Sequence, residues 1–128
     1  MKDIEDIQDI ELFVNEFYSK VRRDKLIGPV FLAKIPGDWQ AHLNKMYSFW
    51  NAALFGVAGY KGNPFSKHAP LQIEPAHFER WLDLFAETID KNFDGPRAAD
   101  TKSRAALMAG MFLKRLAQMW GGPDKIIV

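Results

Sequence analysis

The sequence predicts an all-helical fold, and three observations carry that prediction. Apolar residues recur at steps of three and four positions in four long segments, which is the spacing of one face of an α-helix. Glycine and proline residues gather between these segments, where they end one helix and begin the next. No stretch alternates apolar and polar residues for long enough to indicate a strand. We therefore expect three or four long helices and two short ones in one compact domain that covers residues 1–128.

The first predicted helix covers about residues 6–23. Its apolar face consists of Ile7, Ile10, Val14, Phe17 and Val21. Tyr18 lies at the edge of that face, so we expect its hydroxyl to point inward, where a buried phenol needs a hydrogen-bond partner. An ordinary core tyrosine bonded to a carbonyl oxygen satisfies the same pattern. Gly28 ends this helix, and Pro29 opens a short second helix that carries Phe31.

A break at residues 36–38 precedes the predicted third helix, which covers residues 39–55. Its apolar face consists of Trp39, His42, Leu43, Met46, Phe49, Trp50 and Ala53. His42 is therefore expected on the buried side. A lone histidine on an apolar face is more often a core residue with a hydrogen-bond partner than a ligand. The periodicity alone leaves both interpretations open.

Residues 56–64 contain three glycines and a proline, which predicts a loop. The loop leads to a short helical turn at residues 65–69 that carries His68 and is stopped by Pro70. One histidine beside a proline is more often a surface or capping residue. We interpret His68 as the axial ligand of a haem iron, an interpretation that needs support from the other helices.

Two long helices are predicted in the last part of the chain. The first covers about residues 74–92, and its apolar face consists of Phe78, Trp81, Leu82, Phe85 and Ile89. Trp81 can bury its ring while its indole N–H faces a cavity, although ordinary core packing explains it too. The second covers about residues 96–120 and ends at Gly121. Residues 1–8 and 121–128 are expected to be loose termini.

The composition excludes several classes of protein. The formal net charge is +1, so nothing indicates nucleic acid or an anionic membrane surface as a partner. Zero cysteines exclude disulfides, thiolate metal sites and covalent attachment of a haem. The acidic N-terminus does not resemble a signal or transit peptide, and no apolar run is long enough to span a bilayer. We expect a cytoplasmic protein.

The chemistry-bearing residues are few. The three histidines are His42, His68 and His77, and no zinc-protease motif, carboxylate cluster or phosphate-binding loop accompanies them. A zinc enzyme needs at least three protein ligands and is therefore disfavoured. A haem needs one imidazole, a flat apolar slot and a few donors on the opposite face. A chain with 13% aromatic residues can build that slot.

The order and spacing of residues through most of the chain resemble the third group of truncated haemoglobins, the bacterial two-over-two globins. The residues that carry this resemblance are Phe17, Tyr18, Val21, Arg22, Gly28, Pro29, Val30, Phe31, His42, Leu43, Lys45, Met46, Phe49, Trp50, Tyr60, Gly62, Pro64, Lys67, His68, His77, Phe78, Trp81, Leu82, Leu84 and Phe85. The absence of paired glycines beside the short helices also fits this group. The resemblance implies an all-α truncated globin fold, a helical sandwich around a non-covalent haem b.

The resemblance also implies roles for individual residues. His68 matches the proximal iron ligand, and Tyr18, His42 and Trp81 match distal residues that face the bound ligand. In this group the histidine that His42 matches swings as a gate to solvent. The further residues expected at the haem are Phe31, Lys45, Met46, Phe49, Trp50, Lys67, Leu71 and Phe78. Met46 departs from the branched aliphatic residue usual in the family, and His77 matches no family ligand and is expected at the surface or at a helix start.

The implied function is reversible binding of dioxygen and other diatomic molecules, NO and CO among them. Hydrogen bonds from the distal residues would slow dioxygen release, which suits nitric oxide removal or peroxide chemistry better than transport. The redox partner is an unknown reductase, and a monomer is favoured. The alternative is a haem-free helical interaction or sensor module whose aromatic residues are only core. That alternative gives no reason why four residues have the spacing found in the family. They are Tyr18, His42, His68 and Trp81.

Overall fold

The computed structural model describes residues 1–34, 39–58 and 75–119. These residues form the helices α1 (Ile7–Arg23), α2 (Gly28–Lys34), α3 (Trp39–Phe55), α5 (Pro75–Asn92) and α6 (Pro96–Met119). Over the described ranges every regular element is a helix, which confirms the predicted fold class. The predicted turn at residues 65–69 lies outside the described residues, as do the C-terminal residues 121–128.

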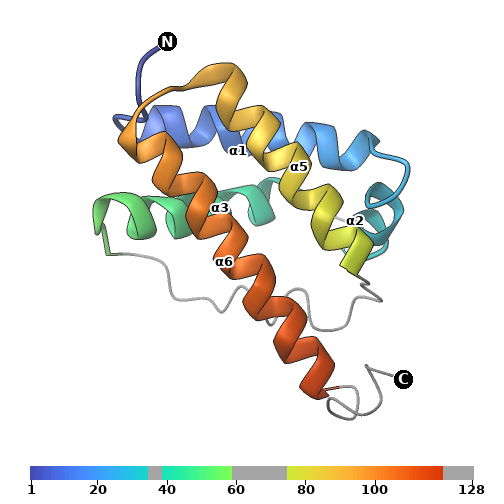
Figure 1. The fold of residues 1–128 in the computed structure, drawn as a ribbon. Coiled ribbons are helices and arrows are strands. Elements are labelled where there is room, and N and C mark those ends of the chain that lie inside the picture. The colour runs from blue at the N-terminus through green and yellow to red at the C-terminus, as the bar shows by residue number, and fades with distance from the viewer. Residues whose placement is uncertain (35–38, 59–74, 120–128) are drawn as a thin grey trace.

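The long helices form two pairs. Helix α1 contacts α2, α3 and α5, and α5 contacts α6. Figure 1 shows that α1 and α3 run in opposite directions, as do α5 and α6, and that the second pair crosses the first. The contact between α1 and α5 joins the two pairs. The residues of α1 that face α3 and α5 are therefore central to the core.

Helix α1 begins where the sequence predicted. The side chain of Asp6 accepts a hydrogen bond from the Asp9 backbone N–H, which satisfies one of the free donors of the first turn. The predicted apolar face is wrong at one position, because Ile7 is 39% exposed. Phe13 is fully buried instead, and Ile4 from the preceding segment is buried beside it in the same core cluster.

Flat side chains make up the centre of the core. Phe13 of α1 meets the rings of Trp50 of α3 and Phe85 of α5 edge-on, with 5.9 Å between ring centroids in both cases. The Trp50 and Phe85 rings stack at 5.4 Å. Offset-stacked and edge-to-face arrangements are the favourable geometries of aromatic pairs. Three helices are thus joined at one aromatic cluster.

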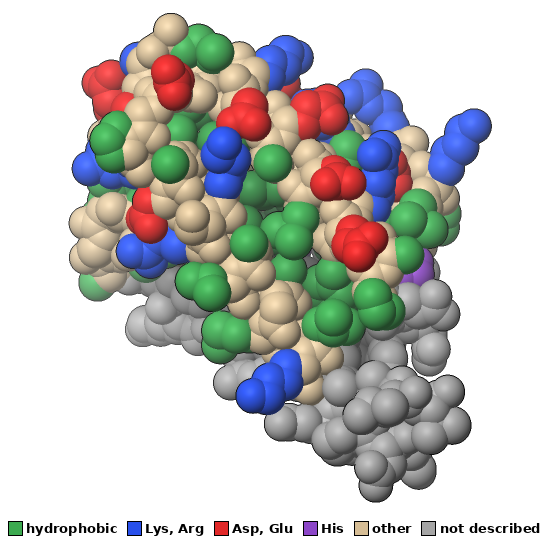
Figure 2. Space-filling view, viewed as in Figure 1, with side chains coloured by type: hydrophobic (Ala, Val, Ile, Leu, Met, Phe, Trp, Pro, Cys, Tyr) green, Lys and Arg blue, Asp and Glu red, His purple; other side chains and the backbone are tan. Residues whose placement is uncertain are grey.

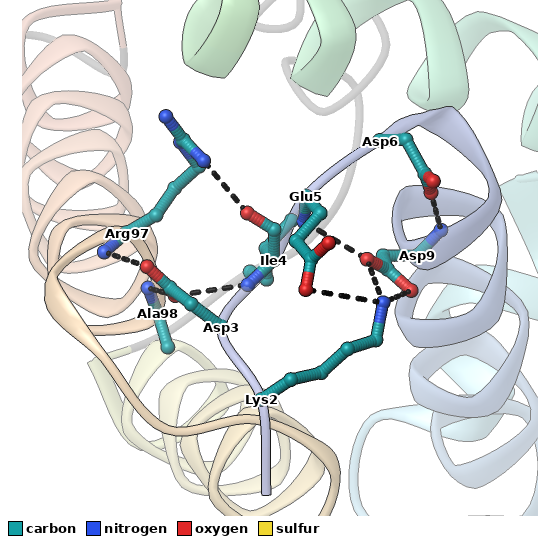
Figure 3. Close-up of polar contacts among 8 residues, drawn as sticks. All are labelled: Lys2, Asp3, Ile4, Glu5, Asp6, Asp9, Arg97 and Ala98. Atoms are coloured by element: carbon teal, nitrogen blue, oxygen red, sulfur yellow. Dashed lines mark hydrogen bonds and ion pairs between the residues drawn. The ribbon is translucent and has the colours of Figure 1, made fainter.

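The N-terminal residues differ from the expectation that residues 1–8 are loose. Ile4 is fully buried. The carboxylate of Asp3 accepts hydrogen bonds from the backbone N–H groups of Arg97 and Ala98 at 2.9 and 2.7 Å, as Figure 3 shows. The Arg97 guanidinium donates to the Ile4 carbonyl oxygen at 2.8 Å. The free N–H groups in the first turn of α6 need acceptors, and Asp3 supplies them from a distant part of the chain.

We call residues 2–4 and their contacts with the start of α6 the N-terminal clasp. A further contact ties this segment to α1. The Lys2 ammonium lies 2.7 and 2.9 Å from the two carboxylate oxygens of Asp9. Gly95 has φ +145°, a conformation that favours glycine, and a Cβ atom there would lie 2.6 Å from the Asp3 Cγ atom. The close approach of Asp3 to α6 therefore depends on glycine at position 95.

We expect Asp3→Ala to lower the free energy of unfolding by about 0.5 to 2 kcal/mol, the range measured for helix N-caps. Burial raises the pKa of Asp3, but the N–H groups of Arg97, Ala98 and Ile4 outweigh it, and the pKa lies below its ordinary value. A carboxyl with a lowered folded-state pKa stabilises the fold above its unfolded pKa, and this contribution is lost as the pH falls through the folded value. Urea unfolding at pH 7 and near pH 3 measures both effects.

Asp3→Asn is the matched variant, because its amide keeps one acceptor oxygen but no titratable group. Its stability relative to Asp3→Ala should not change with pH. A difference between wild type and Asp3→Ala that stays constant into acid would contradict the assignment of Asp3 as the capping group.

Positive and negative side chains are interspersed over the face drawn in Figure 2, while hydrophobic side chains gather over α6. Leu107 and Met111 of α6 are 68% and 57% exposed. A mixed surface of this kind sets up no strong field of one sign on that face. Among the described helices, none combines the length and the apolar character that crossing a bilayer requires.

Candidate functional site

Two apolar hollows meet at Trp81 of α5. Their unfilled space is about 380 and 400 Å³, the part open to solvent included. The first hollow, between α2, α5 and α6, is lined by Ile27, Val30, Phe31, His77, Phe78, Trp81, Ala109 and Phe112. The second, between α1, α3, α5 and α6, is lined by Val14, Phe17, Tyr18, Met46, Phe49, Trp50, Trp81, Phe85, Met108 and Phe112. The walls are mostly flat or aliphatic side chains, which suits a planar apolar ligand.

Tyr18 is held in the wall of the second hollow by α1. Its side chain is 4% exposed, and its ring lies 4.9 Å from Phe17 and 6.4 Å from Phe31, measured between centroids. Burial raises the pKa of the Tyr18 phenol above its ordinary value. The hydroxyl therefore stays protonated throughout the physiological pH range and can act as a hydrogen-bond donor.

His42 of α3 meets Tyr18 of α1. The two rings stand nearly perpendicular with centroids 5.0 Å apart, and His42 is 6% exposed. The Trp39 ring lies 5.7 Å from His42, again edge-on, and 6.0 Å from Tyr18, so the three rings contact one another. The guanidinium of Arg22 covers the Trp39 ring at 4.9 Å, a cation–π contact. The structure thus brings together two of the three polar side chains that the sequence assigned to the distal pocket.

Trp81 of α5 lines both hollows, as does Phe112 of α6. Its ring stacks on Phe85 with 5.5 Å between centroids and 13° between planes. Phe17 meets it edge-on at 5.3 Å. Trp81 and Tyr18 both line the second hollow.

The remaining predicted haem contacts fall into three sets. Phe31 and Phe78 line the first hollow, and Met46, Phe49 and Trp50 line the second. Lys45 is exposed on α3 and lines neither hollow. Lys67, His68 and Leu71 lie outside the described residues. Their assigned roles as propionate contact, proximal ligand and haem contact stay predictions.

Several residues of the site were not singled out from the sequence. Met108 and Phe112 of α6 are half-buried and line the second hollow, and the apolar periodicity of a helix does not show that a residue borders a hollow. His77 is half-buried in the first hollow, where we expected a surface or helix-start residue. It is the third residue of α5, so the helix-start part of that expectation is correct. Trp39 lies one helical turn before His42, a spacing that could have shown their contact.

A sequence profile described as bacterial-like globin matches residues 4–113. The chain belongs to this family. The group 3 truncated haemoglobin ctb of Campylobacter jejuni is 32% identical over 118 residues, which cover 89% of this chain and 93% of that protein. The group 1 truncated haemoglobin GlbN of a Nostoc species is 28% identical over 110 residues, or 83% of this chain and 89% of that protein.

Comparison of structures agrees with the sequence comparison. The crystal structure of the group III truncated haemoglobin from Campylobacter jejuni matches with a TM-score of 0.83 and 33% identity, covering 96% of this globin and all of that chain. The predicted truncated globin fold and the predicted resemblance to the third group are both confirmed. The pair of α1 and α3 and the pair of α5 and α6 are the two layers of this globin fold.

Membership of a globin family implies haem binding, and the described residues fit that implication. A haem is flat and largely apolar, and the two hollows together offer aromatic walls from α1, α2, α3, α5 and α6. The polar side chains that border them or lie next to them, Tyr18, His42 and Trp81, can donate hydrogen bonds. Within the described ranges, no three His, Cys, Asp or Glu side chains gather in a way that could hold a bare metal ion.

Proposed function

We propose that this globin binds a non-covalent haem b through His68 and reversibly binds dioxygen, NO and CO on the side of Tyr18, His42 and Trp81. The observation that carries the proposal is the meeting of the buried Tyr18 and His42 rings, 5.0 Å apart, beside a hollow that Trp81 also lines. Ordinary core packing would not need a phenol and an indole in the wall of one apolar cavity with an imidazole packed against the phenol.

The haem supplies the iron that holds the diatomic ligand, and the chain controls how long the ligand stays. Burial raises the pKa of the Tyr18 phenol further above neutrality, so its hydroxyl is protonated and can donate. The Trp81 indole can only donate. Hydrogen bonds to a partly charged acceptor contribute about 1.5 to 3 kcal/mol each. Two such donors at the second hollow support slow release of dioxygen.

We propose that His42 controls access to this side. Its ring packs edge-on against both Tyr18 and Trp39, which also contact each other. Rotation of the imidazole away from these two rings would open a path from solvent past the start of α3. Arg22, which lies over Trp39, would stabilise the closed arrangement.

Slow release suits chemistry on the bound ligand better than transport. Oxidation of nitric oxide or activation of peroxide would fit such a site, with a separate reductase returning the iron to the ferrous state. We propose that the globin acts as a monomer in the cytoplasm. The Campylobacter relative is described as a truncated haemoglobin of the same group, which supports the haem and the gas ligand but not a particular reaction.

A haem titration of the purified protein tests the proposal. We expect an intense Soret band that saturates at one haem per chain, with unfolding shifted to higher temperature, because a ligand that binds only the folded state stabilises it. The same titration in concentrated urea is the control. Colourless protein whose cooperative unfolding does not respond to haem would contradict the proposal and favour the haem-free interaction or sensor module.

A further inference from the structure

Asp24 occupies the junction between α1 and α2 and is the starting point of this inference. Its carboxylate accepts hydrogen bonds from the backbone N–H groups of Leu26 and Ile27 at 3.0 and 3.1 Å. Its carbonyl oxygen accepts from the Gly28 N–H at 3.0 Å. The Asp24 side chain is only 7% exposed. The carboxylate is therefore fixed in place before any partner from another helix is considered.

Arg80 of α5 supplies that partner. Its Nε atom lies 2.7 Å from an Asp24 carboxylate oxygen, a hydrogen-bonded ion pair between residues 56 positions apart in the chain. Arg80 directly precedes Trp81. The pair therefore joins the α1–α2 junction to the turn of α5 that carries the distal indole.

The α1–α2 junction cannot easily move to follow a shift of α5. A Cβ atom on Gly28 would lie 3.0 Å from the carbonyl oxygens of Val21 and Arg22, so α2 begins in direct contact with the end of α1. Ile27 is 1% exposed and lines the first hollow together with Trp81. The junction is thus a rigid part of the pocket wall.

The other neighbours of Trp81 hold its ring differently. Phe85 stacks on it and Phe17 meets it edge-on, both through apolar contacts. Dispersion contacts of this kind change little when one surface slides along another, whereas a charge-assisted hydrogen bond is short and directional. Among the side-chain contacts described for this turn of α5, the Arg80 ion pair is the directional contact next to Trp81.

We propose that Asp24 and Arg80 are positioning residues of the distal pocket, whose ion pair fixes Trp81 on α5 relative to α2 so that the indole N–H is aimed at the bound ligand. This inference rests on the proposed function, because it assumes that Trp81 is a distal donor. Neither residue is assigned contact with the haem or the ligand. They act through the position of Trp81.

The chain offers a matched control on the same two helices. Lys20 of α1 and Glu87 of α5 form an ion pair at 3.2 Å, in which Lys20 is 17% and Glu87 65% exposed. Like the Asp24–Arg80 pair, in which Asp24 is 7% and Arg80 45% exposed, it joins one well-covered side chain to one exposed side chain. Glu87→Gln therefore removes an ion pair between α1 and α5 that lies about two helical turns after Arg80 on α5, away from the turn that carries Trp81.

The test compares dioxygen dissociation from the full-length haem-loaded globin in four variants: Arg80→Met, Arg80→Lys, Asp24→Asn and Glu87→Gln. We expect Arg80→Met and Asp24→Asn to speed dissociation by at least about threefold, because the donor geometry is lost. Arg80→Lys should recover part of the effect, and Glu87→Gln should stay close to the wild-type rate. In a Trp81→Phe background the effect of Arg80→Met should disappear, as a double-mutant cycle requires of residues that act through one another.

A second readout does not depend on release rates. In the CO complex, the indole N–H resonance of Trp81, assigned by its loss in Trp81→Phe, should shift in Arg80→Met and not in Glu87→Gln. An unchanged resonance, or an equal rate effect of Arg80→Met with and without Trp81, would overturn the inference. If Trp81→Phe alone left dissociation unchanged, the proposed donor role would fail, and the resonance would still decide whether the pair positions the ring.

Discussion

Replacing His68 by glycine is expected to abolish coordination of the haem iron by the protein. Of the other two imidazoles, His42 packs against the Tyr18 ring with 5.0 Å between centroids. His77 borders the first hollow from α5 and is the residue to examine next if His68 is not the ligand. The chain also has no cysteine that could take over as a ligand. Absorption and resonance Raman spectra of the ferrous protein should show loss of the iron–histidine band.

Added imidazole separates loss of the ligand from loss of the fold. A glycine at position 68 leaves space that free imidazole can fill, so the spectrum of the wild-type complex should return as imidazole is added. Spectra of His68→Gly that match wild type without imidazole would show that another residue is the proximal ligand, and His77→Gly would be the next variant to examine.

Most helix boundaries could be predicted because their signals are local. Prolines at positions 75 and 96 open α5 and α6, and Asp6 caps α1. These signals act within one turn of helix, so the sequence around each site is enough to find them. The fold class followed from them together with the apolar periodicity.

The N-terminal clasp could not be predicted because its contacts are distant in sequence. Asp3 and Arg97 are 94 positions apart. Nothing near Asp3 indicates that its carboxylate caps α6, and a short polar segment before a helix usually frays. The Asp24–Arg80 pair could not be predicted either, because its residues are also far apart in the sequence and each alone looks like a solvated charge.

For the candidate site, periodicity showed which residues are buried but not what they border. Tyr18, His42 and Trp81 lie on apolar faces like any core residue, and only the family resemblance assigned them to one pocket. The structure brings Tyr18 and His42 into contact and places Trp81 in the wall of the same hollow as Tyr18. Trp39 was not assigned to the site because it is not among the residues that carry the family resemblance. Its ring nevertheless contacts both Tyr18 and His42.

Tyr18→Phe and Trp81→Phe are each expected to speed dioxygen dissociation by about tenfold or more. A lost hydrogen bond of about 1.5 to 3 kcal/mol corresponds to that change, at about 1.4 kcal/mol per tenfold. Phenylalanine at position 18 keeps the ring contacts with Phe17, Phe31 and His42, so only the hydroxyl is removed. Stopped-flow displacement of dioxygen by CO measures the rate.

Tyr47→Phe is the matched control for Tyr18→Phe. The Tyr47 hydroxyl donates to the side chain of Asn15 on an exposed part of the α1–α3 contact, and Tyr47 lines neither hollow. Its removal should leave the dissociation rate unchanged. Because burial raises the pKa of Tyr18, the phenol does not ionise near neutrality, and the wild-type rate should not accelerate between about pH 6 and pH 9 through loss of this donor. A change below threefold in both Tyr18→Phe and Trp81→Phe would mean that neither side chain reaches the ligand, and the slow release argued from their burial would have no physical basis.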